Sequence, residues 1–207
     1  MNPSDSAMPD THIDIQTAAN VNPAATTVNN SFYYGEADTS RMAADFERLR
    51  EEIRKGVTQD IINELKFYIT ELPGTKSVEE KLADGRFNED QIFDAVCQKD
   101  MYARRAEQYQ YYPSAQQIIF DLFSSIKNAF KTDIFPMIAR GEELTVVMQA
   151  VRSNIVLDIK GKLEKMGSRD EYLHFSEDHI YGMIYYLTGM CHLNWTVYSK
   201  ALEPLEP

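Results

Sequence analysis

The sequence predicts an all-α protein, a helical bundle of six to eight helices preceded by a flexible N-terminal tail. From residue 40 onward apolar side chains recur at steps of three and four, as they do on one face of a helix. No alternating pattern typical of a strand extends over a useful length. Capping and stop residues divide the chain at intervals. We therefore expect a tail over residues 1–38 and one helical domain over 39–207, with an N-terminal part (39–112) and a C-terminal part (113–207).

The predicted tail differs in composition from the rest of the chain. Residues 1–38 are rich in proline, asparagine, alanine and threonine and contain few large apolar side chains. Such a segment cannot bury enough surface to offset the entropy that it would lose on ordering. Its aromatic cluster, Phe32–Tyr34, is a candidate for docking on the helical body or on a partner.

The first helical pattern extends over residues 40–72 as one apolar stripe. Gly56 interrupts this stripe at a cost of roughly 1 kcal/mol relative to alanine, and residues 58–60 offer a new N-cap. The pattern therefore predicts either one long helix or two helices with a bend, ended by the Pro73–Gly74 pair.

Capping boxes predict the starts of the next two helices. The Ser77–Glu80 segment opens a short helix that closes near Gly85, and Asn88–Gln91 opens a longer one that runs towards Tyr112. The helix that follows begins at Ser114, and its apolar residues fill a wide face. A wide apolar face indicates a helix that packs against several neighbours.

The C-terminal part continues as helices separated by proline and glycine. Pro136 predicts a kink or a break because it lacks the amide that its helix would need, and Gly141 predicts a stop. The next helix has acids at its head, at 142–143, and lysines near its tail, as the helix dipole favours. We expect Gly167 to be its left-handed C-cap, and a final apolar helix over about 176–188.

The charge balance argues against direct binding of nucleic acid or anionic lipid. The 207 residues include 32 acids and 21 bases, for a net charge of -11, which disfavours contact with phosphate. No stretch approaches about 18 uninterrupted apolar residues. Cys97 and Cys191 show no paired spacing, which fits a reducing compartment. We expect a soluble, cytoplasmic protein without a membrane partner.

Patterns for catalysis and metal binding are weak throughout. His174, His179, Cys191 and His192 are candidate metal ligands, but their spacing matches no familiar zinc site, so we expect hydrogen-bonded side chains instead. The Pro73–Ser77 loop lacks the glycines of a phosphate-binding loop. Pairs of acids open predicted helices, where the dipole explains them. We therefore expect no catalytic, cofactor-binding or metal-binding residue, no cofactor and no enzymatic activity.

Aromatic residues crowd the last predicted helix. Tyr181, Tyr185 and Tyr186 place phenol groups on more than one side of it. Tyrosine anchors protein interfaces because it buries much area while keeping a polar end. We expect this helix to be the central element of its own bundle, to offer a face to a partner, or to do both.

The same segment carries a resemblance to a known family. Residues 178–195 contain Gly182 within the helix, the run Tyr185–Gly189, then Cys191–His192 and Trp195. This arrangement resembles the closing motif of the C-terminal domains of bacterial ABC-ATPase three-component conflict systems, which include relatives of Lamassu-type antiphage defence. The polar end of the tail resembles the linker that often precedes such domains.

The motif gives a set of residues expected to serve packing and interaction. They are Tyr181, Gly182, Tyr185, Tyr186, Gly189, Cys191, His192 and Trp195. Gly182 should permit close approach of another helix, and Gly189 should end the helix. Cys191, His192 and Trp195 should then fold back against it as a buried plug.

The resemblance implies a function in a complex. In that family such a domain is joined to, or accompanies, an effector and connects it to an SMC-like or ABC ATPase and a small middle component. Because no effector domain precedes the motif, we expect a non-enzymatic adaptor subunit that links the ATPase to a separate effector and meets nucleic acid only through the complex. The alternatives are a helical metal-dependent hydrolase that uses the four candidate ligands, and a homo-oligomeric regulatory or phage-related structural protein.

Overall fold

Helices make up most of the described structure. The computed structural model describes residues 36–71 and 76–197, with side chains from residue 41 onward. The elements in chain order are α1 (Glu36–Lys55), α2 (Asn63–Ile69), α3 (Val78–Asp84), α4 (Glu89–Tyr109), α5 (Pro113–Ala129), η1 (Phe130–Ile134), α6 (Phe135–Ala139), α7 (Leu144–Val151), η2 (Arg152–Val156), α8 (Leu157–Met166) and α9 (Glu177–Gly189).

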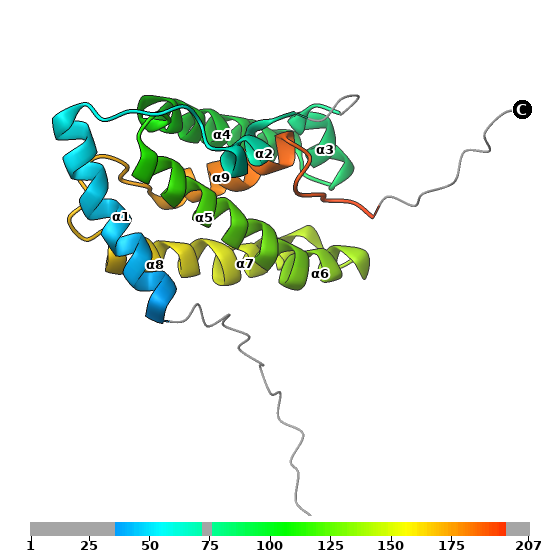
Figure 1. Cartoon of the computed structure of the whole chain (residues 1–207). Helices are drawn as coiled ribbons and strands as arrows, with labels where there is room; N and C mark the ends of the chain where they lie inside the picture. The colour runs from blue at the N-terminus through cyan, green and yellow to red at the C-terminus, as the bar shows by residue number, and fades with distance from the viewer. Residues whose placement is uncertain (1–35, 72–75, 198–207) are drawn as a thin grey trace, which may run out of the picture. The chain divides into compact units, whose positions relative to one another are not determined.

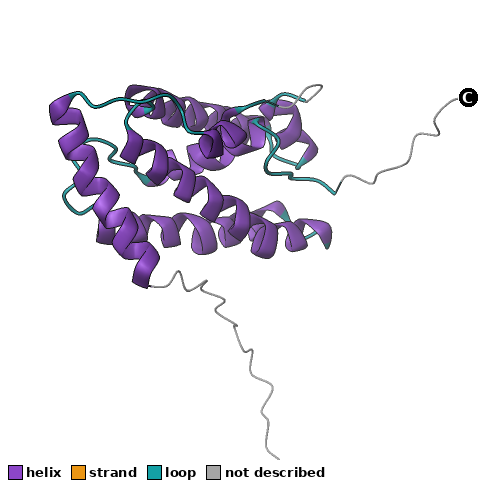
Figure 2. Cartoon of the chain, in the orientation of Figure 1, coloured by secondary structure: helices purple, strands orange, loops and turns teal. Residues whose placement is uncertain are grey.

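Two π-helical turns keep neighbouring helices continuous. α5 runs into α6 through η1, and α7 runs into α8 through η2. With each joined rod counted as one helix, the described residues form seven helices and no strand (Figure 2). The predicted all-α bundle of six to eight helices is confirmed. In that part of the chain no helix combines the length and the apolar character needed to span a membrane.

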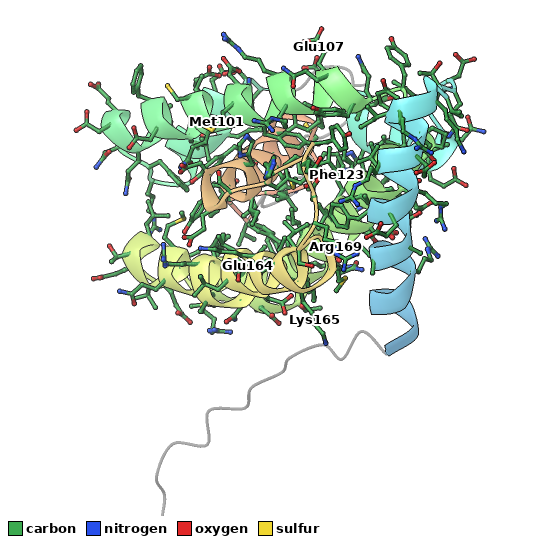
Figure 3. All side chains as sticks on the ribbon, turned by 90° about the vertical axis from the view of Figure 1, so that its left-hand side faces the viewer. Met101, Glu107, Phe123, Glu164, Lys165 and Arg169 are labelled. Carbon is green, nitrogen blue, oxygen red and sulfur yellow. The ribbon has the colours of Figure 1, made fainter. Side chains whose placement is uncertain are left out.

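Helix α9 forms the centre of the bundle. It packs along α4 and also against α3, α5 and α8 (Figure 1). Phe123 of α5 lies in the interior between α4 and the rod of α7 and α8, whereas Glu164 and Lys165 of that rod face outward (Figure 3). A helix covered on most sides needs no polar face, which explains why the last helix of the sequence is apolar nearly all round.

The first apolar stripe is divided between two helices. α1 begins at Glu36, earlier than the predicted residue 40, because a first turn needs no apolar side chain. It ends before Gly56, whose φ is +66°, and α2 starts only at Asn63. The predicted cap at residues 58–60 is wrong. The N-cap Ile62 makes no side-chain cap bond, and its amide donates to Gln116 Oε1 at 2.9 Å.

The predicted capping boxes of α3 and α4 are confirmed. Ser77 accepts from the Glu80 amide while Glu80 accepts from the Ser77 amide, and Asn88 and Gln91 make the equivalent pair. α4 ends at Tyr109, before the predicted Tyr112, because that residue is already the extended N-cap of α5. Such reciprocal bonds involve only residues three apart, which is why the sequence alone reveals them.

Proline and glycine act differently at three predicted breaks. The chain remains helical through Pro136, which follows η1 in the first turn of α6, so no break occurs there. Gly141 ends that rod with a φ of +75°, as predicted. The left-handed cap predicted at Gly167 is wrong, since its φ is -101°. A Cβ there would lie 3.0 Å from the Phe46 ring, so this glycine serves close packing.

Three predictions concern residues outside the described ranges. Apart from the start of α1, the predicted tail over 1–38 lies outside them, together with the Phe32–Tyr34 cluster. The predicted stop at Pro73–Gly74 also lies there.

Candidate functional site

The candidate site is α9 together with the turn that follows it, and it begins with a third capping box. Ser176 accepts from the His179 amide, while the Ser176 amide donates to His179 Nδ1 at 3.2 Å. Burial of the imidazole lowers the pKa of His179, and the nearby Arg105 charge lowers it further. A histidine in place of the usual Glu or Gln gives this helix start a titratable cap.

The acids at the head of α9 are held by neighbouring helices. Glu177 pairs with Lys160 of α8 at 2.7 Å, and this hydrogen bond lowers the pKa of Glu177. Arg152 lies 3.1 Å from the same carboxylate. Asp178 accepts from Gln98 of α4 at 3.0 Å. Both acids lie in the first turn of α9, where the helix dipole favours them, as the sequence suggested, and these contacts also tie that turn to neighbouring helices.

α9 packs closely against α4 at Gly182. A Cβ at this position would lie 2.2 Å from the Gln98 carbonyl oxygen and 2.7 Å from the Tyr102 Cβ. Neither atom is the end of a flexible side chain, so any side chain at this position would push the two helices apart. The expected role of Gly182 in close helix approach is confirmed.

The three tyrosines of α9 lie on different sides of the helix. Tyr185 is buried and meets Phe87 edge to face, with Tyr181 stacked beside it. Tyr186 points elsewhere, stacking on Phe123 at 5.8 Å. Burial raises the pKa of all three phenols. Each ring is therefore largely used for packing inside the bundle.

A Schellman motif closes α9. The His192 amide donates to the Leu187 carbonyl at 2.8 Å, and the Cys191 amide donates to the Thr188 carbonyl at 3.1 Å. α9 ends at Gly189, as predicted, yet the left-handed residue of the motif is Cys191, with a φ of +65°. A residue with a Cβ is strained in that conformation, so other contacts must hold it.

Lys81 of α3 supplies those contacts, a role that the sequence did not predict. Its ammonium is buried, donates to the carbonyls of Thr188 and Gly189 at 3.0 and 2.7 Å, and lies 2.9 Å from Cys191 Sγ. A cation at this end of a helix satisfies free carbonyls and complements the dipole. The available signal was its place beside Val78 and Leu82, on the apolar side of a short helix.

Trp195 completes the site beneath the turn. Its ring packs against Phe87 and Phe130, and its Nε1 donates to Thr188 Oγ1 at 3.0 Å. The predicted plug is confirmed for Trp195, which is 4% exposed. It is wrong for Cys191 and His192, which are only half-buried because the Schellman turn carries them to the rim.

His192 reaches across the rim to α2. Its Nε2 lies 3.0 Å from the Phe67 carbonyl, so this nitrogen carries the hydrogen and donates. Its ring also contacts the rings of Phe67 and Tyr68. The Lys127 ammonium lies 4.6 Å from the centre of the Phe67 ring, within cation–π range. Burial, together with the Lys127 charge, lowers the pKa of His192.

Residues 77–195 match the family model for C-terminal domain 9 of the ABC-three component (ABC-3C) systems. The chain belongs to this family. The match starts at the α3 capping box and ends at Trp195, so the ABC-3C domain comprises α3 to α9 and the closing turn. It confirms the three-component family inferred from the closing motif. No curated protein and no solved structure matches the chain.

The four candidate metal ligands do not converge in this ABC-3C domain. His174 is exposed, and His179 lies in the first turn of α9. Cys191 and His192 follow the last turn, about 20 Å away along a helix that rises 1.5 Å per residue. Within the described ranges no three His, Cys, Asp or Glu side chains gather as metal ligands do. The geometry thus gives no support to the alternative of a metal-dependent hydrolase.

Proposed function

We propose that this chain is a non-enzymatic adaptor subunit of a bacterial antiphage defence complex related to Lamassu systems, and that it acts in the cytoplasm. In this proposal it links an SMC-like or ABC ATPase to an effector. Membership of the ABC-3C family supports the existence of other components as partners. The use of Gly182, Tyr185 and Trp195 for internal packing supports a structural role for the motif.

The observation that carries the proposal is an exposed aromatic ring attached to the closing turn. Phe67 is 57% exposed, although Tyr68 beside it is buried. We call Phe67, Lys127 and His192 the closing-turn surface. The hydrogen bond from His192 fixes the Phe67 backbone, so the family motif positions this ring. A fixed exposed aromatic beside a cation is typical of interface hot spots.

Co-purification of the reconstituted system tests this proposal. The chain is co-expressed with the ATPase and the effector of its own system, and the tagged ATPase is purified. The wild-type chain should be retained, whereas Phe67→Ala should lower the retained amount at least about tenfold, since a hot-spot residue carries that much binding energy. Tyr111→Ala is the matched control, because Tyr111 is an exposed aromatic residue between α4 and α5.

Folding and binding are separated by measuring both variants alone. Thermal unfolding of Phe67→Ala should differ little from that of the wild type, because more than half of the residue is exposed and only its contacts with Tyr68, His192 and Lys127 are lost. Undiminished retention of Phe67→Ala, or failure of the wild-type chain to co-purify with the ATPase, would contradict the proposal.

A further inference from the structure

The ammonium of Lys81 and the thiol of Cys191 are in contact where α3 meets the closing turn. Lys81 Nζ lies 2.9 Å from Cys191 Sγ, although the two residues are 110 positions apart in the sequence. The lysine is only 5% exposed, whereas the cysteine lies half-buried at the rim and has a free thiol. A small solute can therefore reach the sulfur from solvent, while the nitrogen beside it stays covered by protein.

Backbone contacts hold both reactive groups in place. An ammonium has three hydrogens, and two of them are directed at the Thr188 and Gly189 carbonyls, at 3.0 and 2.7 Å, which leaves the third for the sulfur. When the ammonium of Lys81 gives up that third proton, the lone pair of the amine points at Sγ. The Schellman turn fixes Cys191 on the other side, with a φ of +65°. The pair is thus preorganised for a bond between nitrogen and sulfur.

We propose that this pair is a modification site, at which a peroxide oxidises Cys191 and Lys81 then captures the oxidised sulfur as a sulfenamide, a covalent nitrogen–sulfur bond. In the first step the sulfur attacks the peroxide and the oxygen–oxygen bond breaks. The sulfur loses two electrons and becomes a sulfenic acid, and the peroxide is reduced with release of one water. This inference does not depend on the adaptor role.

The second step needs no further oxidant. The ammonium of Lys81 releases one proton to solvent, and the amine nitrogen attacks Sγ. The nitrogen–sulfur bond forms as the sulfur–oxygen bond breaks, and the hydroxyl group leaves as water with one of the amine hydrogens. Two molecules of a thiol reverse the modification, because they reduce the bond to the thiol of Cys191 and the free amine while forming a disulfide between themselves.

The bridge changes the junction between α3 and the end of α9. A sulfenamide nitrogen has one hydrogen and no charge, so it can donate to only one of the two carbonyls that the ammonium now bonds. The bridge also ties α3 covalently to the turn that carries His192. The redox state of the surroundings would thereby set how firmly the closing turn is held.

Mass spectrometry of the full chain tests the bridge. Cys97→Ser is the starting protein, because Cys97 is the other cysteine of the sequence and its removal excludes a disulfide within the chain. After treatment with hydrogen peroxide the chain should lose about 2 Da, the mass of two hydrogens. Proteolysis should then release the segments around Lys81 and Cys191 as one joined peptide. Dithiothreitol should restore the original mass and separate the two peptides.

Replacement of the lysine separates the bridge from simple oxidation of the thiol. Lys81→Arg keeps a cation for the carbonyls, but a guanidinium stays protonated and does not attack sulfur. The joined peptide should therefore fall at least about tenfold, while dimedone still labels the sulfenic acid of Cys191. Lys76→Arg is the matched control, because Lys76 is an exposed lysine just before α3 that pairs with Asp84. This variant should give as much joined peptide as the starting protein.

A second variant keeps the test decisive if Lys81→Arg does not fold, which its thermal unfolding shows. Cys191→Ser leaves the lysine in place and should give no joined peptide. A joined peptide that persists in either variant would overturn the proposal. So would a Cys191 that gains about 16 or 32 Da without joining Lys81, or one that peroxide leaves unmodified, because the contact would then serve packing alone.

Discussion

At the scale of single residues, Gly182 gives the most direct test of how α4 meets α9. Gly182→Ala places a Cβ 2.2 Å from the Gln98 carbonyl oxygen, so the helices must separate. We expect a loss of about 1–3 kcal/mol in the free energy of unfolding, or more, measured by urea denaturation. Gly161→Ala is the control, since nothing lies within 4 Å of its Cβ position in α8. There alanine should raise stability by up to about 1 kcal/mol.

Trp195 tests whether the closing turn belongs to the core. Trp195→Ala removes a ring that contacts Phe87 and Phe130, and should lower the free energy of unfolding by about 3–5 kcal/mol. Trp195→Phe keeps an aromatic ring and loses the hydrogen bond to Thr188, so it should cost less. Equal losses in the two variants, measured by thermal and urea unfolding, would show that the ring contacts contribute little.

His179 makes stability depend on pH. Burial lowers the pKa of His179 below its ordinary value of 6.5, so the unfolded chain takes up its proton first as the pH falls. The contribution of this residue is therefore present above about pH 6.5 and is lost as the pH falls from there towards the lowered folded value. His179→Gln keeps a capping box and should reduce the fall in melting temperature between about pH 7.5 and 5.5.

Two other histidines serve to separate the effect of His179 on the pH dependence of stability from the effects of other groups. His192, whose pKa is lowered too, should leave some pH dependence in the His179→Gln variant. His174→Gln, at an exposed position, should behave as the wild type. If His174→Gln reduced the pH dependence as much as His179→Gln, the cap would not be its origin.

At the scale of helices, the sequence predicted the features that depend only on residues close together in the chain. The boxes at Ser77 and Asn88 each involve residues three apart, and both were recognisable in the sequence. The start of α2 was not, because the Ile62 amide is satisfied by Gln116, far along the chain. The continuity of the rod at Pro136 was not recognisable either, because the proline alone does not indicate the π-helical turn that precedes it.

Lys81 joins α3 to α9, and its removal should loosen that junction. Lys81→Met keeps an unbranched side chain of similar length but removes the side-chain donor to the Gly189 carbonyl and one of the donors to the Thr188 carbonyl. We expect a loss of about 1–3 kcal/mol in the free energy of unfolding. Lys165→Met, at an exposed position of α8, should change it by less than about 0.5 kcal/mol. Equal effects of both substitutions would show that the ammonium is dispensable at this junction.

At the scale of the whole molecule, the sequence predicted the interior better than the surface. The structure shows the packing expected of Gly182 and Trp195, whereas Cys191 and His192 of the same motif lie at the rim. The exposed rings of Phe93 and Phe67 were not anticipated. The sequence of α4 has apolar residues on two sides of the helix, and only the position of α9 in the fold determines which side is buried. Surface patches depend on that choice, so periodicity alone could not assign them.

Net charge leads to a prediction about nucleic acid. The chain has 32 acids against 21 bases, and its basic groups are partly engaged: Arg105 donates to the Tyr172 and Leu173 carbonyls, and Lys160 pairs with Glu177. The chain alone should therefore bind duplex DNA no more tightly than about 10⁻⁴ M at physiological salt, the weak end of non-specific binding. Fluorescence anisotropy with a labelled duplex measures this affinity.

The same assay also compares the duplex affinity of the isolated chain with that of its complex with the ATPase. Residues 1–30 contain three acids, Asp5, Asp10 and Asp14, and no lysine or arginine. Their deletion removes no group that could neutralise a phosphate, so the duplex affinity of the complex with the ATPase, and its dependence on salt, should stay unchanged. An unchanged duplex affinity is expected only if this subunit meets nucleic acid through the ATPase. A large drop in duplex affinity on deletion, or micromolar binding by the isolated chain, would place this subunit at the nucleic acid itself.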